Sequence, residues 1–218
     1  MRQPHRFAIT AVLLGCMSAS AQDWVKYVNL TDRFIVNFPG EPEIREFTYV
    51  SEYAANLPAK AYAVEDDSGR YSVTVVDYTN AEQALRARPN DTYRGDDLTS
   101  DVLGSVAYAA AHLRNRGGAI TYDAWAAVDR IAGHQLQITN PDGSRTFAGI
   151  YLHASRLYIL EATVPEGWPP PGHFQQSLGV LDAHGKRVRY ELDVDGNRTR
   201  VETAYEWTGS DEPELDNR

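Results

Sequence analysis

Imidazole side chains are the first candidates for chemistry in this sequence, because they bind metals and transfer protons near neutral pH. His134 and His153 fall on two neighbouring predicted strands, where they could approach each other, and Asp129 or Glu161 would add a carboxylate. However, no two histidines have the spacing of a helical zinc site, and the sequence has no H-E-x-x-H motif. Strand histidines are more often structural or solvated. We therefore predict no metal site, and keep His134 with His153 as the alternative.

Serine hydroxyls offer a second route to catalysis, but their local sequence context is poor. The chain has neither G-x-S-x-G nor S-x-x-K, and Ser105 and Ser177 have no base close in sequence. Because a triad can assemble from distant residues, a hydrolase stays open as an alternative. There is no Walker loop and no dinucleotide fingerprint. We predict no catalytic residue and no cofactor.

Aromatic side chains are the candidates for binding. Trp125, Tyr151, Tyr158 and Trp168 form the richest aromatic set, and the role we favour for them is core and sheet cover. Trp168 differs because three consecutive prolines follow it, residues 169–171. A rigid loop that presents an exposed tryptophan suits recognition of a ligand or peptide. Trp168 is therefore our predicted binding residue.

Residues 1–21 have the features of a signal peptide. Arg2 and Arg6 precede an apolar run, residues 7–14, which is much shorter than the roughly 20 residues that span a bilayer. No later stretch is apolar enough for a transmembrane helix. The sequence therefore predicts export to the periplasm or the medium.

Two cleavage sites compete in this leader. Ala19-Ser20-Ala21 fits ordinary signal peptidase, which would cut between Ala21 and Gln22. The alternative is "LLGC", which resembles a bacterial lipobox and would leave a lipid on Cys16. We favour the cut after Ala21. Cys16 is the only cysteine in the chain, so either cut predicts a folded body without thiols or disulfides.

The charge of the chain limits its partners. Its 218 residues include 30 acidic and 21 basic side chains, with a formal net charge of −9. Such a chain is repelled by nucleic acids and anionic lipids. We expect no nucleic acid partner, and membrane contact only if Cys16 is lipidated.

The elements that would position these side chains alternate between strands and helices. Strands are predicted at 34–38, at 43–50, and in a hairpin that turns at 66–69. Residues 80–87 make a short helix, and 96–118 a long one with a periodic apolar face and a Gly117-Gly118 stop. Further strands follow at 119–125, 126–131, 135–138, 146–153 and 156–164, and a shorter helix near 174–178.

This order predicts the α+β class: an antiparallel sheet of two meander halves, with the long central helix and the shorter C-terminal helix packed on it. We expect residues 22–184 to form a single domain, residues 185–208 an appended β-hairpin, and residues 209–218 an acidic disordered tail. Asp195-Gly196 predicts a two-residue turn that places Asp193 opposite Arg198 and Glu191 opposite Arg200.

Three features together resemble the PsbP-like fold. They are "DRFIVNFPGEP" soon after the leader, the long central helix, and "FQQSLGVLD" in the late helix. The resemblance is to uncharacterised exported bacterial proteins of that type. It implies an antiparallel sheet between helices and mostly accessory, non-enzymatic roles, and it supplies no catalytic motif.

These observations predict an exported, non-enzymatic binding or accessory module of the bacterial cell envelope. Its partner is expected to be a protein or small ligand there. The alternatives are a hydrolase with a site built from separated residues, and a lipid-anchored structural protein of the envelope.

Overall fold

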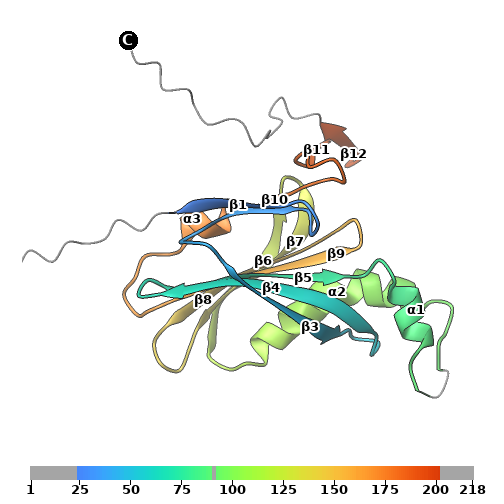
Figure 1. Ribbon diagram of the computed structural model, residues 1–218, viewed down its shortest axis with the longest axis horizontal. Helices are drawn as coiled ribbons and strands as arrows, with labels where there is room; N and C mark the ends of the chain where they lie inside the picture. The colour runs from blue at the N-terminus through green and yellow to red at the C-terminus, as the bar shows by residue number, and fades with distance from the viewer. Residues whose placement is uncertain (1–23, 90–91, 202–218) are drawn as a thin grey trace, which may run out of the picture.

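A computed structural model describes residues 24–89 and 92–201 of the chain. Its centre is a large antiparallel sheet made of β3 (Glu43–Val50), β4 (Asn56–Asp66), β5 (Gly69–Asp77), β6 (Ala119–Val128), β7 (Ile131–Thr139), β8 (Arg145–His153) and β9 (Arg156–Val164). The seven strands have the order β3-β4-β5-β9-β8-β7-β6 (Figure 1). Two meanders, β3–β5 and β6–β9, therefore join where β5 pairs with β9. The predicted α+β class, with its two meander halves, is confirmed.

A smaller sheet covers one face of the large sheet. It consists of β1 (Val25–Asn29), β2 (Phe34–Phe38) and β10 (Gly179–Val180), and the short helix α3 (Gly172–Gln175) lies beside it (Figure 1). Alternation along β2 turns Phe34, Val36 and Phe38 inward, and all three are completely buried. This second sheet goes beyond the sequence prediction, because β2 pairs with β10 from the far end of the chain.

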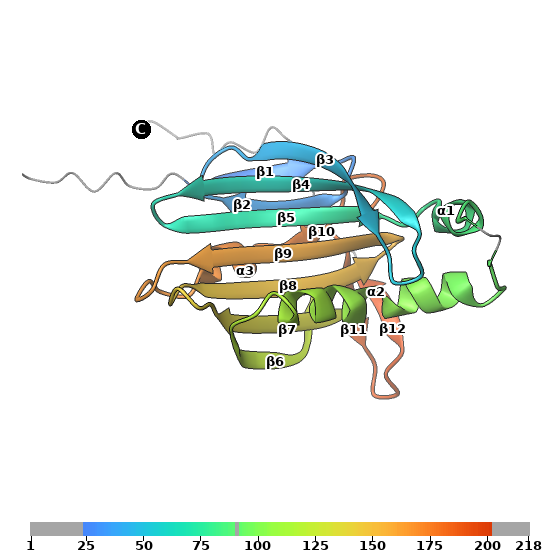
Figure 2. The ribbon, with the colours of Figure 1, turned by 90° about the horizontal axis from the view of Figure 1, so that it is seen from below.

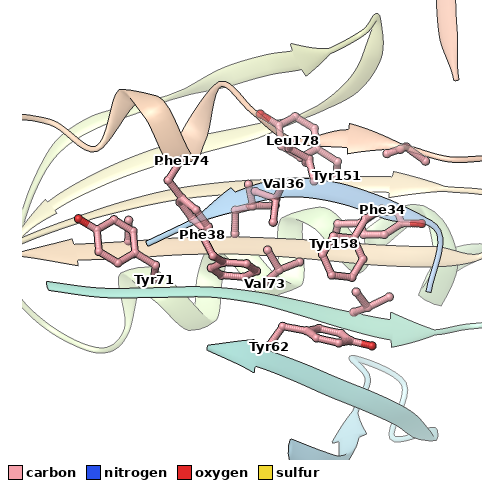
Figure 3. Close-up of a cluster of buried hydrophobic side chains, with 14 of the residues drawn as sticks. Phe34, Val36, Phe38, Tyr62, Tyr71, Val73, Tyr151, Tyr158, Phe174 and Leu178 are labelled. Carbon is pink, nitrogen blue, oxygen red and sulfur yellow. The ribbon is translucent and has the colours of Figure 1, made fainter. Parts of the chain in front are cut away.

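Aromatic rings fill the space between the two sheets (Figure 3). Phe174 from α3 lies between Phe38 and Tyr71, with ring centroids 5.4 and 5.5 Å away. Tyr62 contacts Phe34 at 5.0 Å. Each fully buried apolar ring contributes about 1.5–3 kcal/mol. This face of the large sheet therefore carries the main hydrophobic core.

The opposite face packs against α1 (Ala81–Arg86) and α2 (Asp97–Arg114). The predicted apolar stripe of α2 places Ala109, Ala110 and Leu113 on the sheet, where all are buried. At the N-terminus of α2, where the helix dipole is positive, the Asp97 carboxylate accepts a hydrogen bond from the Arg88 guanidinium at 2.6 Å. α2 contacts β7, β8 and β9, whereas β3, β4 and β5 lie to one side of the helix (Figure 2).

The boundary between β6 and β7 differs from the prediction. The segments 119–125 and 126–131 are not two strands, because β6 runs without interruption to Val128. The chain turns at Asp129 and Arg130, whose φ angles are +49° and +66°. Such turns usually carry glycine or asparagine, and because neither residue stands at these two positions, no turn was predicted there.

The C-terminal hairpin forms, but in another register. It consists of β11 (Arg189–Leu192) and β12 (Arg198–Val201), and Leu192 pairs with Arg198. The predicted pairing of Asp193 with Arg198 is therefore wrong. Asp193 instead closes a three-residue loop, since its Oδ1 accepts hydrogen bonds from the amides of Asp195 and Asn197, at 3.0 and 2.8 Å.

The register shift also changes the contacts of Arg200. Its guanidinium binds Asp182 at 2.5 Å rather than the predicted Glu191, so it ties β12 to the body of the protein. The base of the hairpin rests on the main core through Val188, which is buried, and Tyr190. The predictions for the leader, including Cys16 and the Ala21–Gln22 cut, and for the tail lie outside the described residues.

Candidate functional site

His134 lies on the α2 face of β7, beside the last turn of α2. Its Nε2 is 2.5 Å from Oδ1 of Asp123 on β6. Arg114 donates from Nε and Nη2 to the two oxygens of the same carboxylate, at 2.7 and 2.8 Å. The guanidinium of Arg114 holds the pKa of Asp123 down at about 2, and His134 adds to this effect. The three side chains tie the end of α2 to β6 and β7.

His153 lies on the other face of the sheet. His134 pairs with Ile150 of β8, and Ile150 packs in the core under α2. His153 stands three positions after Ile150 on β8, so its side chain points to the opposite face. There the Nε2 of His153 is 3.0 Å from the Tyr190 hydroxyl, and burial lowers its pKa. The structure therefore does not bring His134 and His153 together. No group of three or more metal-binding side chains occurs in residues 24–89 and 92–201.

The carboxylates that could have completed a metal site form ion pairs. Asp129 accepts a hydrogen bond from Nε of Arg187 at 2.6 Å. Glu161 binds the guanidinium of Arg116 through both of its oxygens. Asp129 thus fastens the base of the hairpin, while Glu161 lies on the α2 face of β9.

The two candidate serines serve the local backbone. Ser105 is completely buried in α2 and donates to the carbonyl of Val102 at 2.8 Å. Ser177 donates to the carbonyl of Phe174 at 2.8 Å and accepts from the amide of Asn37 at the same distance. Their hydroxyls stabilise α2 and the turn after α3.

Both tryptophans of the aromatic set are exposed, although only Trp168 was considered as a binding residue. Trp168 is 42% exposed in the loop after β9, where its carbonyl accepts a hydrogen bond from Arg145. Its role in binding stays a prediction. Trp125 was expected to serve as core or sheet cover, but it is 78% exposed. It lies on the edge strand β6, where its ring meets that of His134 edge-on at 5.4 Å. Tyr151 and Tyr158 are buried as expected.

A hollow on the α2 face lies between β3 and the C-terminal half of α2, and is named here the α2 groove. Its volume is about 720 Å³. Its floor consists of short side chains from β4 and β5, namely Ala61, Ala63, Ser72 and Thr74. α2 lies over the half of the sheet that contains β7 and β8 (Figure 2). The groove exists because the short side chains of β4 and β5 do not fill the space beside the helix.

Three arginines surround this floor. Arg45 stands on β3, one strand from Ala61, with which it pairs. Arg70 lies two positions before Ser72 on β5 and marks one end of the groove. Arg116 follows the C-terminus of α2 on the side opposite β3. The acidic side chains of the groove are Glu43 and Glu161.

These arginines differ in how strongly they are engaged. Arg116 is paired with Glu161, and the guanidinium of Arg45 lies 5.4 Å from the ring centre of Phe47. Arg70 is exposed and has no ion pair with any residue in the described part of the chain. The C-terminus of α2 adds about half a negative charge nearby, which one free guanidinium outweighs. The lining thus has three arginines against two glutamates, and Glu65 of β4 stands opposite Arg70 in the register.

A second hollow, of about 600 Å³, lies near the β1–β2 turn. Two of its acidic groups have partners: Glu46 binds Lys60 at 3.2 Å, and Asp32 accepts a hydrogen bond from the Tyr62 hydroxyl. Arg156 also lines this hollow, and its Nε is buried without a hydrogen-bond partner in the described residues.

Comparisons with known proteins concern the fold. No model of a protein family matches the chain, and no curated protein matches it. The solution structure of cyanobacterial PsbP (CyanoP) from Synechocystis sp. PCC 6803 is similar, with a TM-score of 0.43 and 10% sequence identity over 78% of this chain and 99% of that chain. This likeness says nothing about a ligand. None of the described helices has the length and hydropathy needed to cross a membrane.

Sequence reasoning missed the α2 groove. In β5 the residues Ser72 and Thr74 alternate with Val73 and Val75, a pattern that indicates one buried and one solvated face. That polar face is the floor of the groove. A signal was therefore present, but an ordinary solvated strand has the same one.

Proposed function

We propose that this protein is an exported, non-enzymatic binding module of the bacterial cell envelope, and that its α2 groove binds a ligand with carboxylate or phosphate groups. The observation that carries the proposal is Arg70. It is a guanidinium without an ion pair in the described structure, beside the hydroxyls of Ser72 and Thr74. The net charge of −9 makes such a positive position notable.

The chemistry of the groove favours an anion. A guanidinium offers a planar fork of donors that matches carboxylate and phosphate. Hydroxyls two positions apart on β5 point to the same face, and no hydrogen bond within the described residues engages those of Ser72 and Thr74. Arg45 and Arg116 add positive charge across the floor. Because the groove is open to water, each charge contact is worth about 0.2–1 kcal/mol.

The test measures equilibrium binding by calorimetry at low ionic strength, with inorganic phosphate, citrate and a hexaglutamate peptide as probes. We expect the multivalent probes to bind more tightly than phosphate, and binding to weaken as salt screens the charges. Arg70→Glu should weaken binding about tenfold, which corresponds to about 1.4 kcal/mol.

Arg189→Glu is the matched control, because Arg189 is an exposed arginine of β11, outside the groove. It makes the same change of charge and should leave affinity within about twofold. Equal losses in both variants would show a nonspecific charge effect and would overturn the proposal. Absence of binding by every probe would also contradict it.

Export is the second part of the proposal, and the mass of the exported protein tests it. We expect cleavage to leave Gln22 as the first residue and the product to be soluble. A mass that fits Cys16 with an attached diacylglycerol, together with retention in the membrane fraction, would establish the lipid-anchored alternative instead.

A further inference from the structure

The two edges of the large sheet are protected very differently. The β3 edge carries Glu43, Arg45 and Glu46, and charged side chains on an edge discourage other strands from pairing with it. The β6 edge, in contrast, carries a single charged residue, Asp123. That carboxylate is already neutralised by Arg114.

The β6 edge also exposes large apolar side chains. Ile120, Tyr122 and Trp125 are 45%, 44% and 78% exposed. β6 pairs only with β7 among the described strands, so its outer backbone N–H and C=O groups form no sheet ladder. A long apolar edge of this kind is a template for a further strand.

We propose that β6 pairs antiparallel with β6 of a second copy of this chain, about a two-fold axis at Ala124, so that the two large sheets become continuous. Two properties of β6 favour a second copy over a foreign strand, and they concern size and charge.

The side chains of β6 are complementary in size about this axis. Residues whose numbers sum to 248 lie opposite each other across the two copies. Tyr122 therefore faces Ala126 of the second copy, and Ala124 faces Ala124 of the second copy. The large ring of Tyr122 thus meets a small side chain. The irregularity between Ile120 and Tyr122 limits regular pairing to residues 122–126.

The charges are complementary as well. An axis at Ala124 sets Trp125 opposite Asp123 of the second copy and avoids two carboxylates facing each other, which would be destabilising. Because Arg114 binds that carboxylate, the indole of Trp125 also comes close to a guanidinium, a favourable contact for an aromatic face. The edge is therefore neutral where the copies meet, although the chain as a whole is acidic.

The hairpin β11–β12 supplies an independent reason. It stands on the side of the small sheet, and it reaches past the level of β6 (Figures 1 and 2). Its outer part exposes Leu192 by 49% and Val194 completely. A second copy at the β6 edge would lie under this overhanging apolar arm, on the face that carries Tyr122.

Disulfide mapping in the full chain tests the pairing and its register. In a Cys16→Ser background, Ala124→Cys is the only thiol, and its symmetric position should give a rapid disulfide-linked dimer under mild oxidation. Ala126→Cys alone should crosslink poorly, whereas a mixture of Ala126→Cys and Tyr122→Cys chains should crosslink to each other.

Sedimentation without any crosslink supplies the second readout. Concentrated wild-type protein should show a dimer mass, and Trp125→Lys should shift it to the monomer without changing the circular dichroism. Ile44→Lys on the exposed β3 edge is the matched control and should leave the dimer intact. A monomer at all concentrations, or faster crosslinking through Ile44→Cys than through Ala124→Cys, would overturn the proposal. Neither result would affect the α2 groove, which lies on the β3 side of the sheet.

Discussion

The two faces of the large sheet are built for different tasks. The face toward the small sheet is closed by interlocking rings from β2, α3 and the sheet itself, such as Phe34, Tyr62 and Phe174. The face toward α2 is closed by α2 over β7, β8 and β9 and by α1 over part of β4, and the part between has the short floor of the α2 groove. Under the proposed function, stability and binding are separated across one sheet. The closed face holds the fold, so the part-open face is free to carry charge.

The largest expected effect is the loss of a ring from the closed face. Phe174→Ala leaves a cavity between Phe38 and Tyr71 and should destabilise the protein by about 3–5 kcal/mol. Ser72→Ala on the groove floor should change stability by less than about 0.5 kcal/mol. Urea unfolding of both variants checks the contrast. Similar losses in the two variants would mean that the groove floor is as tightly packed as the core.

A second comparison concerns two buried tyrosines, one on each face. The Tyr62 hydroxyl binds Asn29 at 3.0 Å and also Asp32, whereas the Tyr78 hydroxyl has no hydrogen-bond partner within the described residues. Tyr62→Phe should therefore cost about 1.5 kcal/mol, while Tyr78→Phe should be neutral or stabilising. Thermal or urea unfolding of the two variants measures this difference in stability. A loss for Tyr78→Phe equal to that for Tyr62→Phe would show that the Tyr78 hydroxyl is paired.

The smallest of these effects concerns acid. Because the pKa of Asp123 is lowered to about 2 in the folded protein, its ionised form stabilises the fold above about pH 4, and this contribution is lost as pH falls toward 2. The pair is partly exposed, so Asp123→Asn should cost about 1 kcal/mol or less near neutral pH. Unfolding measured from pH 2 to 7 should show the two curves converge at the acid end. A constant difference across this range would contradict the role of the ion pair, and Glu191→Gln on the exposed hairpin serves as the control.

Local patterns in the sequence predicted much of the closed face and little of the open one. Alternation in β2 and the apolar stripe of α2 are properties of a few neighbouring residues, so Phe34, Val36 and Leu113 could be placed in the core from sequence. The second sheet depends on β2 meeting β10, and such a long-range pairing leaves no local trace. The predicted hairpin register was wrong because the side chain of Asp193 stabilises a loop one residue longer than the predicted turn.

The candidate site was harder to predict than the fold. The groove depends on where α2 crosses the sheet, and the spacing of residues within α2 says only which side it buries. Trp125 was misplaced for a related reason, because β6 lies at the edge of the sheet, where its ring is left uncovered. Candidates picked by residue type, such as His134 and His153, lie on opposite faces because alternation along β8 separates their positions.

The most direct test of the division between the two faces is an NMR titration of the protein with hexaglutamate at low ionic strength. We expect the amide signals of Arg45, Arg70, Ser72 and Thr74 to shift in a saturable way, with those of the closed face, such as Val36 and Val180, unchanged. The same titration of Arg70→Glu should show much smaller shifts. Saturable shifts centred on Trp168 or on β6 instead, or no shifts at all, would contradict the assignment of the α2 groove as the binding surface.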